Sequence, residues 1–413
     1  MVGTMALLRA FIRTARMARN TSRLAAGLPA DDEVLLDAPD DRLGPALVAA
    51  GRGEYGPAAE LLATTRAAAE WEDRDRCTRR LAAFARSRPE WLADWRAADP
   101  HDPDALLVGA QLAVDRCWES PARAELLGEL GPLITAAAEA EPRDPVPWRI
   151  ALDHARGTHA GHAAFERLWG EAVRRAPHHY GCHVAALQYL SAACCAQWGD
   201  TPHTERPSHR ECFDFAERAA QDALPCSLVQ ALPVRAAFAC LTDGCGAAVP
   251  RIRPDARGTA VARALPDAGG EAMAQARPDA GGAAVPRARL DAAADLAIAL
   301  SAGYPAGDPW PAEVRNLLAY VLVRLERWPD ALDQLRLIGP HATSFPWDRI
   351  SDDPLGQFLE VRDGVRIAVA SQLPLGGPVP PGLTAVPRQP WGFEDAPPYP
   401  RSEHDGRARS GDH

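Results

Sequence analysis

The sequence contains no lysine, because all 45 of the Lys and Arg positions among its 413 residues are arginine. Without a lysine amine no Schiff base can form on the chain, which excludes covalent lysine catalysis. A phosphate-binding loop of the Walker type also needs its lysine, so an ATPase of that kind is excluded. One missing residue type therefore removes two large classes of enzyme.

Aromatic residues are scarce at 6%, although hydrophobic residues make up 47% of the chain. Much of that hydrophobic content is alanine, the residue with the highest intrinsic helix propensity. Alternating runs of β-branched and aromatic residues, which are typical of strands, are few. The composition therefore predicts an all-α protein.

Basic fields, long apolar runs and disulfide patterns are also missing. The net charge is −10, so the chain has no electrostatic footprint for nucleic acid. Nine cysteines are too few and too scattered for a small secreted disulfide scaffold. No run approaches the roughly eighteen apolar residues of a membrane span, and arginines interrupt the apolar stretch that a signal peptide would need. We therefore expect a cytoplasmic protein with free thiols.

Residues 5–20 predict a short helix with arginines on more than one face. It is either an exposed helix or an anchor to anionic lipid. Its apolar face, formed by Leu7, Leu8, Phe11 and Ile12, is small. That size favours the exposed helix, and membrane contact is not expected.

Three stretches predict pairs of helices joined by a short turn, at residues 41–66, 130–177 and 312–340. In "RNLLAYVLVRLERWPDALDQLRLIGP", Leu318 packs the first helix, Trp328 closes the turn and Pro340 follows the second helix. Small residues at crossing points, a Trp or Tyr at the turn and a Pro after the pair together resemble tetratricopeptide (TPR) repeats.

The spacing of the repeat ends supports this resemblance, because Pro142 and Pro177 are 35 positions apart and the TPR period is about 34 residues. The stretch "RAPHHYGCHVAALQYL" is also similar to one in uncharacterised actinobacterial proteins with TPR-like helices. The resemblance implies an α-solenoid, in which each helix pair buries its apolar face on the next. It implies no activity.

Composition divides the chain into five parts. Residues 246–289 hold four copies of a twelve-residue unit with Pro and Gly in nearly every copy, which predicts a disordered insert or, alternatively, a functional spacer or docking arm. We predict an arginine-rich helix or flexible arm at 1–33, TPR-like helices at 34–245 and at 290–372, and a disordered Pro-rich tail at 373–413. Ser351 and Asp352 are the expected caps of the last helix.

The segment "APHHYGCH" concentrates His178, His179, Cys182 and His183, and further histidines and cysteines follow up to residue 212. One hypothesis is a metal-binding or metal-sensing protein that uses the 178–212 cluster. However, zinc sites usually take paired short spacings such as C-x₂-C, and the chain has none. We favour a turn: Pro177 ends a helix, His178 and His179 follow it, and His183 is the first core contact of the next helix. No cofactor is expected.

The sequence shows no catalytic signature such as G-x-S-x-G, and no carboxylate pair stands out as a general acid and base. We therefore predict a non-catalytic scaffold that binds a protein or peptide. If the first helix of each pair lines a concave face, arginines and amides there would hold a carboxylate or an acidic segment, unless they are simply a solvated face. The candidate binding residues are Arg149, Asp153, Arg156, Gln188, Asn316, Tyr320 and Arg324.

Overall fold

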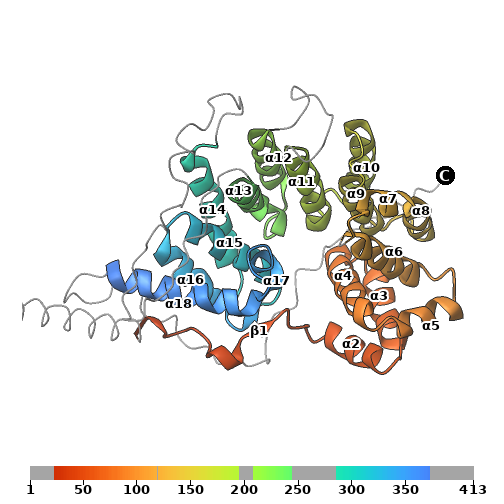
Figure 1. Ribbon diagram of the computed structural model, residues 1–413, viewed down its shortest axis with the longest axis horizontal. Helices are drawn as coiled ribbons and strands as arrows, with labels where there is room; N and C mark the ends of the chain where they lie inside the picture. Colours follow the sequence, from red (N-terminus) through yellow and green to blue (C-terminus); the bar gives the residue numbers. More distant parts are fainter. Residues whose placement is uncertain (1–22, 119, 195–207, 244–284, 373–413) are drawn as a thin grey trace, which may run out of the picture.

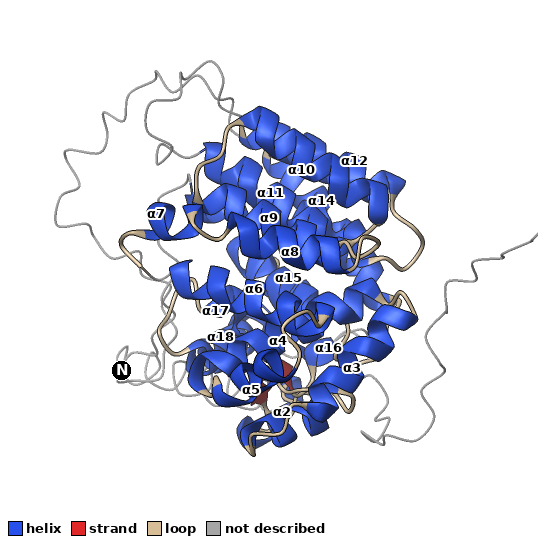
Figure 2. Ribbon diagram, turned by 90° about the vertical axis from the view of Figure 1, so that its right-hand side faces the viewer, coloured by secondary structure: helices blue, strands red, loops and turns tan. Residues whose placement is uncertain are grey.

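The computed structural model describes residues 23–118, 120–194, 208–243 and 285–372. Within these ranges nearly all regular structure is helical, and the strands are two pieces of two residues each (Figure 2). The prediction of an all-α protein is confirmed. No helix in the described ranges combines the length and the apolar character that a membrane span requires.

Helices follow one another with short connections along the whole described chain. The first half contains α2 (Leu43–Gly51), α3 (Gly56–Ala67), α4 (Trp71–Ser87), α5 (Glu90–Ala98), α6 (Pro103–Trp118), α7 (Arg123–Gly128), α8 (Gly131–Ala140), α9 (Val146–Gly157) and α10 (His162–Arg175). The second half contains α11 (Tyr180–Cys194), α12 (His209–Asp222), α13 (Leu232–Asp243), α14 (Arg287–Ala302), α15 (Ala312–Arg324), α16 (Trp328–Ile338), α17 (Ser344–Trp347) and α18 (Pro354–Gln372). Two 3₁₀ turns lie at Asp31–Glu33 and Leu228–Ala231.

Each helix packs mainly on helices that are adjacent or a few places away in the chain. The helices α4, α6, α9, α11, α13 and α15 form a succession in which each contacts the next, and α3, α8, α10, α12, α14 and α16 each pack on one or two of them. The apolar core is divided into four clusters: three are local, within residues 43–112, 107–151 and 152–189, and the fourth spreads over α11 to α18 and includes Leu24 and Val34. In Figure 1 the chain runs from α2 at the lower right, over the top, to α18 at the lower left.

The first described residues return to the last helices and close this path. Strand β1 (Leu35–Leu36) pairs in parallel with β2 (His341–Ala342). Arg336 of α16 donates to the carbonyl oxygens of Leu24 and Ala26. In Figure 1 the segment with β1 accordingly lies beside α18 before it continues to α2. We name residues 23–42 the closing segment.

Helices joined by short connections lie at all three predicted places, although residues 130–177 hold three helices and not one pair. Residues 41–66 fold as α2 and α3, residues 130–177 as α8, α9 and α10, and residues 312–340 as α15 and α16. The apolar positions expected to pack are buried, including Leu318, Ala331 and Leu335. Phe165 and Ala172 of α10 are buried too.

Three boundaries differ from the expectation. Residues 23–33 of the expected flexible arm are packed, because the side chain of Leu24 is buried and backbone carbonyls of the arm accept hydrogen bonds from α16. Helix α14 begins at Arg287, inside the expected insert, because Arg289 pairs with Glu217 of α12. The cap of α18 is Asp353, whose Oδ1 accepts from the N–H of Gly356 at 2.9 Å, and not Ser351 or Asp352. The helix at 5–20, the repeats at 246–284 and the tail at 373–413 lie outside the described residues.

Candidate functional site

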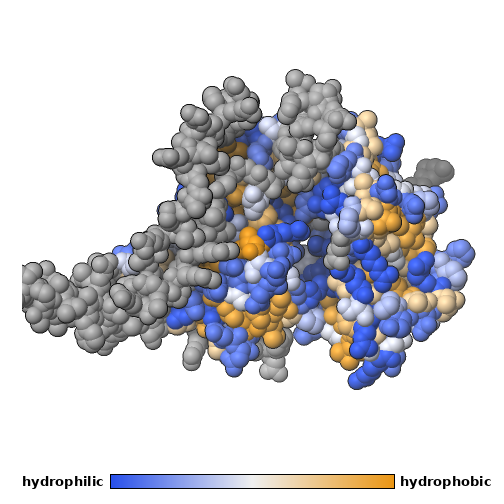
Figure 3. Space-filling view, viewed as in Figure 1, coloured by the Kyte–Doolittle hydropathy of each residue, from blue (hydrophilic) through white to orange (hydrophobic). Residues whose placement is uncertain are grey.

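A polar cavity of about 160 Å³ lies where α4, α9, α11, α13 and the start of α15 meet α17 and the turn after it. It therefore joins the first helices of the chain to the last ones. In the space-filling view this face is hollowed near its centre, and hydrophilic residues gather there (Figure 3). Charged side chains from both ends of the chain line the cavity: Asp75, Arg79, Arg149, Asp153, Arg235, Glu313 and Arg349.

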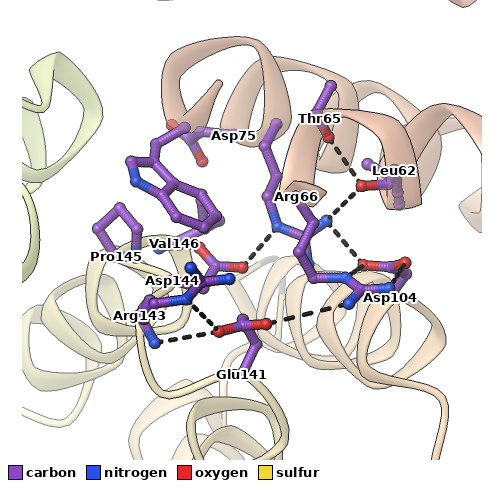
Figure 4. Close-up of polar contacts among 12 residues, drawn as sticks. Leu62, Thr65, Arg66, Asp75, Asp104, Glu141, Arg143, Asp144, Pro145 and Val146 are labelled. Carbon is purple, nitrogen blue, oxygen red and sulfur yellow. Dashed lines mark hydrogen bonds and ion pairs between the residues drawn. The ribbon is translucent and has the colours of Figure 1, made fainter. Parts of the chain in front are cut away.

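The wall on the α4 side rests on a buried ion-pair network that includes Asp104 and Asp144 (Figure 4). Arg74 is 0% exposed; its Nε lies 2.5 Å from Asp144 Oδ2 and its Nη1 lies 2.7 Å from Asp104 Oδ1. Its Nη1 also donates to the carbonyl of Leu62 at 2.9 Å. Asp144 in turn accepts from the N–H of Val146 at 2.8 Å, at the positive end of the α9 dipole. The network fixes α4, α6 and α9 relative to one another.

The next residue of α4, Asp75, faces the cavity. Arg149 of α9 donates from Nε to Asp75 Oδ1 at 2.9 Å and from Nη1 to Asp153 Oδ2 at 3.2 Å. Burial raises the pKa of Asp75, but the charges of Arg149 and Arg79 outweigh it and hold that pKa below its ordinary value. The carboxylate is therefore charged at neutral pH, and Asp75, Arg149 and Asp153 form a buried polar layer.

Gly181 of α11 allows this layer to form. A Cβ on Gly181 would clash with Oδ2 of Asp75, so only glycine lets α11 approach α4 this closely. The N–H of the neighbouring Tyr180 donates to Glu72 Oε1 at 2.6 Å, which ties the start of α11 to the start of α4. The position of α11 thus depends on acidic side chains of α4.

Arg235 of α13 organises the opposite wall. It is buried, its Nε donates to the hydroxyl of Tyr180 at 3.0 Å, and its Nη2 pairs with Glu313 of α15. Its guanidinium carbon also lies 4.7 Å from the ring centre of Phe345, in cation–π contact. Arg235 therefore holds α11, α13, α15 and α17 around the cavity.

Two further arginines at the cavity are much more exposed. The Arg79 side chain is 42% exposed, and its Nε lies 3.7 Å from Asp75 Oδ2 without a hydrogen bond. The Arg349 side chain is 63% exposed, and its Nε lies 3.8 Å from Asp348 Oδ1. Both ion pairs are long, so both guanidinium groups keep donors for another acceptor. Arg79 comes from α4 and Arg349 from the turn after α17.

Three of the seven candidate binding residues meet at this cavity. Arg149 and Asp153 of α9 share a face at i, i+4 spacing as expected, and Gln188 of α11 lines the same cavity. Arg156 is one turn further along α9; it pairs with Asp153 at 3.4 Å and lies over the ring of Trp118.

The other three candidates lie elsewhere, on α15. Asn316 is buried; its Nδ2 donates to the carbonyl of His341 at 3.1 Å, and its Oδ1 accepts from Trp347 Nε1 at 2.9 Å. Tyr320 is buried in the core, and Arg324 lies within 3.4 Å of its hydroxyl. These side chains join α15 to β2 and α17 and do not line the cavity, where α15 supplies Glu313 instead.

The His/Cys segment has the predicted place in the fold. His178 and His179 lie between α10 and α11, and His183 is buried with its ring centre 5.0 Å from that of Trp169. His179 Nδ1 accepts from the N–H of Cys182 at 3.1 Å, and the Cys182 thiol donates to the carbonyl of Pro145 at 3.7 Å.

A metal ion would need several of these groups to converge. Burial raises the pKa of the Cys182 thiol, which favours the protonated donor over a thiolate ligand. Among the described side chains, no three of His, Cys, Asp or Glu converge as a metal site requires. Cys195 and His203 lie outside the described residues.

Sequence reasoning missed Asp75, Arg79, Arg235, Glu313 and Arg349. A signal existed for the first two, since they are i, i+4 neighbours in the charged run "WEDRDRCTRR" of a helix that also carries buried alanine and leucine. No local pattern marks the other three, because each is a single charge on a different element. No protein family model, curated protein or solved structure matches the chain.

Proposed function

We propose that this chain is a TPR-like α-solenoid that binds a carboxylate-bearing segment of a protein partner in its central cavity, without catalysis of its own. The proposed setting is the cytoplasm, where an acidic segment of a protein or peptide would be the ligand. Neither nucleic acid nor a membrane surface is part of the proposal.

The packing order of the helices supports the solenoid part of the proposal. Helices α9, α11, α13 and α15 contact one another in succession, and α10, α12, α14 and α16 each pack against one or two of them. Such nearest-neighbour packing with divided cores is what stacked helix pairs produce. In this arrangement the helices of the inner succession supply the cavity wall, as first helices do in TPR-like stacks.

The observation that carries the binding part is the convergence of four arginines on one cavity, two of them with free donors. Arg149 is held by the buried Asp75 and Arg235 by the partly exposed Glu313, whereas Arg79 and Arg349 make only long ion pairs. A guanidinium fork matches the two oxygens of a carboxylate and recognises it with charge-assisted hydrogen bonds. The buried pairs therefore position the site, and the exposed pair is available for the ligand.

An affinity pull-down with the full chain tests the proposal. The double variant Arg79→Gln/Arg349→Gln removes the two available guanidinium groups and should reduce capture of the partner at least about tenfold, because each charge-assisted hydrogen bond contributes roughly 1.5–3 kcal/mol. The Arg349 side chain is mostly exposed and that of Arg79 is 42% exposed, and neither makes a short ion pair, so the fold should persist, which circular dichroism would check.

The matched control is Arg167→Gln/Arg210→Gln. It changes the net charge equally, but both residues are exposed and lie away from the cavity, on α10 and α12. Capture should survive in this control. Equal loss in both variants would show that binding follows net charge alone, and retention by the Arg79/Arg349 variant would contradict the proposed site.

A further inference from the structure

The charges that line the cavity do not balance. Among the lining residues, four arginines face three carboxylates, namely Asp75, Asp153 and Glu313. Asp348 does not line the cavity but lies 3.8 Å from Arg349, and solvent reaches both Arg79 and Arg349. An occupant that carries one negative charge would balance the lining charges and accept hydrogen bonds from these two arginines without adding an unpaired anion.

The excess charge can be located. Asp75 pairs with Arg149, Arg149 also reaches Asp153, and Glu313 pairs with Arg235. These contacts commit every carboxylate of the cavity to a buried arginine. The positive charge that remains is shared by Arg79 and Arg349, which belong to opposite ends of the chain.

The cavity also limits the size and shape of its occupant. Liquid water takes about 30 Å³ per molecule, so a cavity of about 160 Å³ holds on the order of five water-sized groups. Val184, Ala185 and Phe345 supply an apolar part of the wall. The space fits a single carboxylate with a short uncharged body, so one acidic side chain or chain end of the partner's segment would enter it.

We propose that the cavity binds one singly charged carboxylate, which bridges Arg79 and Arg349 and ties α4 to the turn after α17. This inference rests on the proposed function and specifies its ligand class. A dianion such as phosphate is disfavoured, since its second charge would face Asp75, Asp153 and Glu313. The carboxylate belongs either to a chain terminus or to an Asp or Glu side chain, and both sources present the same group.

Isothermal titration of the full chain with small probes tests the ligand class. N-acetyl-L-alanine carries the carboxylate, N-acetyl-L-alaninamide is its neutral isostere, and inorganic phosphate is the dianion control at matched ionic strength. We expect the acid to bind at least about tenfold more tightly than either control. Equal binding of the amide, or tighter binding of phosphate, would overturn the proposal.

Two capped peptides distinguish the sources of the carboxylate. Acetyl-Gly-Gly-Ala with a free terminus presents a terminal carboxylate, and acetyl-Gly-Asp-Gly-amide presents only a side-chain carboxylate. Binding of either one supports the proposal and identifies the source, whereas binding of neither overturns it.

The variants Arg79→Gln and Arg349→Gln should each weaken binding of the acid about tenfold, and Arg167→Gln should leave it unchanged. A bridge between α4 and the turn after α17 can also be detected by hydrogen exchange. The acid should slow exchange at the N–H groups of Leu35 and Asp37, which donate to the carbonyls of Pro340 and Ala342 and close the chain. Faster or unchanged exchange at saturating acid would contradict a bridge. The two proposals can fail separately. If none of the small carboxylates binds but partner capture still depends on Arg79 and Arg349, the ligand class is wrong and the proposed function stands. If capture is also independent of them, both fail.

Discussion

Two arginines with 0% exposure, Arg74 in the first half of the chain and Arg315 in the second, are satisfied in opposite ways. Arg74 is neutralised by two carboxylates, those of Asp104 and Asp144. Arg315 is surrounded by neutral oxygens: it donates to Ser301 Oγ at 3.0 Å and to four carbonyls at 2.8–2.9 Å, which belong to Ser301, Tyr304, Pro305 and Leu337.

The carbonyls around Arg315 come from the C-terminal ends of two helices. Ser301 lies in the last turn of α14, and Leu337 lies in the last turn of α16. Helix C-termini leave carbonyls unsatisfied and carry partial negative charge, so one guanidinium caps both helices. Burial lowers the pKa of Arg315 to about 10, which still leaves it charged at neutral pH. The comparison shows that buried charge in this fold is matched either by opposite charge or by helix ends.

The strongest test of the comparison is Arg315→Leu. It removes the five hydrogen bonds of the guanidinium and leaves the carbonyl of Tyr304 without a donor, whereas those of Ser301, Pro305 and Leu337 keep a backbone N–H. At about 1 kcal/mol for each lost hydrogen bond, we expect roughly 5 kcal/mol of destabilisation in urea unfolding. If the variant does not fold, Arg315→Lys keeps the charge with fewer donors and should lose a smaller, measurable amount. If Arg315→Leu lowered the free energy of unfolding by less than about 1 kcal/mol, the hydrogen bonds from Arg315 to these carbonyls would not be what stabilises the ends of α14 and α16.

The corresponding change in the first half is Asp144→Asn. It removes one of the two charges that neutralise Arg74, and breaking a buried pair is unfavourable by about 3–5 kcal/mol. We expect a value near 3 kcal/mol, because Asp104 still pairs with Arg74. Asp352→Asn, at an exposed position, is the control and should change the free energy of unfolding by less than about 0.5 kcal/mol. Equal effects at the two positions would contradict the role given to the pair.

A smaller effect is expected from Gly181→Ala. Its Cβ would displace the Asp75 carboxylate and loosen the contact with Arg149, which should destabilise the protein by about 1–3 kcal/mol. Gly170→Ala in α10 is the matched control, since nothing lies near its Cβ, and it should stabilise the protein by about 0.5–1 kcal/mol. Opposite signs for the two substitutions in thermal unfolding would confirm that α11 depends on the acidic layer, and equal signs would contradict it.

The smallest expected effect is a difference in pH dependence. The pKa of Asp75 is lower in the folded chain than in the unfolded chain. Its stabilising contribution is therefore complete above the unfolded pKa and is lost as the pH falls through the folded pKa. The difference in unfolding free energy between the wild type and Asp75→Asn should shrink by on the order of 1 kcal/mol between pH 7 and pH 3.

Arg315 makes no hydrogen bond to a carboxylate, and the nearby charge of Asp308 would act on arginine and lysine alike, so this position supplies the internal reference. Destabilisation by Arg315→Lys should be the same at pH 7 and pH 3. If it shrinks as much as the Asp75→Asn difference does, the two regions do not differ in the way described.

Local pattern was enough to predict most of the fold. In residues 41–66 and 312–340 the apolar spacing, the turn residues and the flanking prolines lie within one helix pair, so its helices can be identified without the rest of the chain. The closing segment could not be predicted in this way. Leu35 and Leu36 form a strand of two residues with no alternation, and their partner is made near the other end of the sequence.

The site could be predicted only in part, for the same reason. Arg149 and Asp153 lie on one face of one helix, and their spacing shows it. Arg79 and Arg349 come together only because the chain closes on itself. Asn316 misled the prediction because a polar residue on a helix is usually exposed, whereas this one satisfies the indole N–H of Trp347 in the core.

The closure also sets an order in time during synthesis. Ser344 donates to the carboxylate of Asp37, which is 307 positions earlier in the chain. At translation rates of about 5–20 residues per second, Ser344 is synthesised roughly 15–60 s after Asp37. Among the described hydrogen bonds between helices of the intervening chain, the longest in sequence, from Tyr180 to Glu72, spans 108 positions, so these helices can pack while the ribosome is still making the rest of the chain. The ring of helices, and with it the cavity between its two ends, is therefore the last part of the molecule to exist.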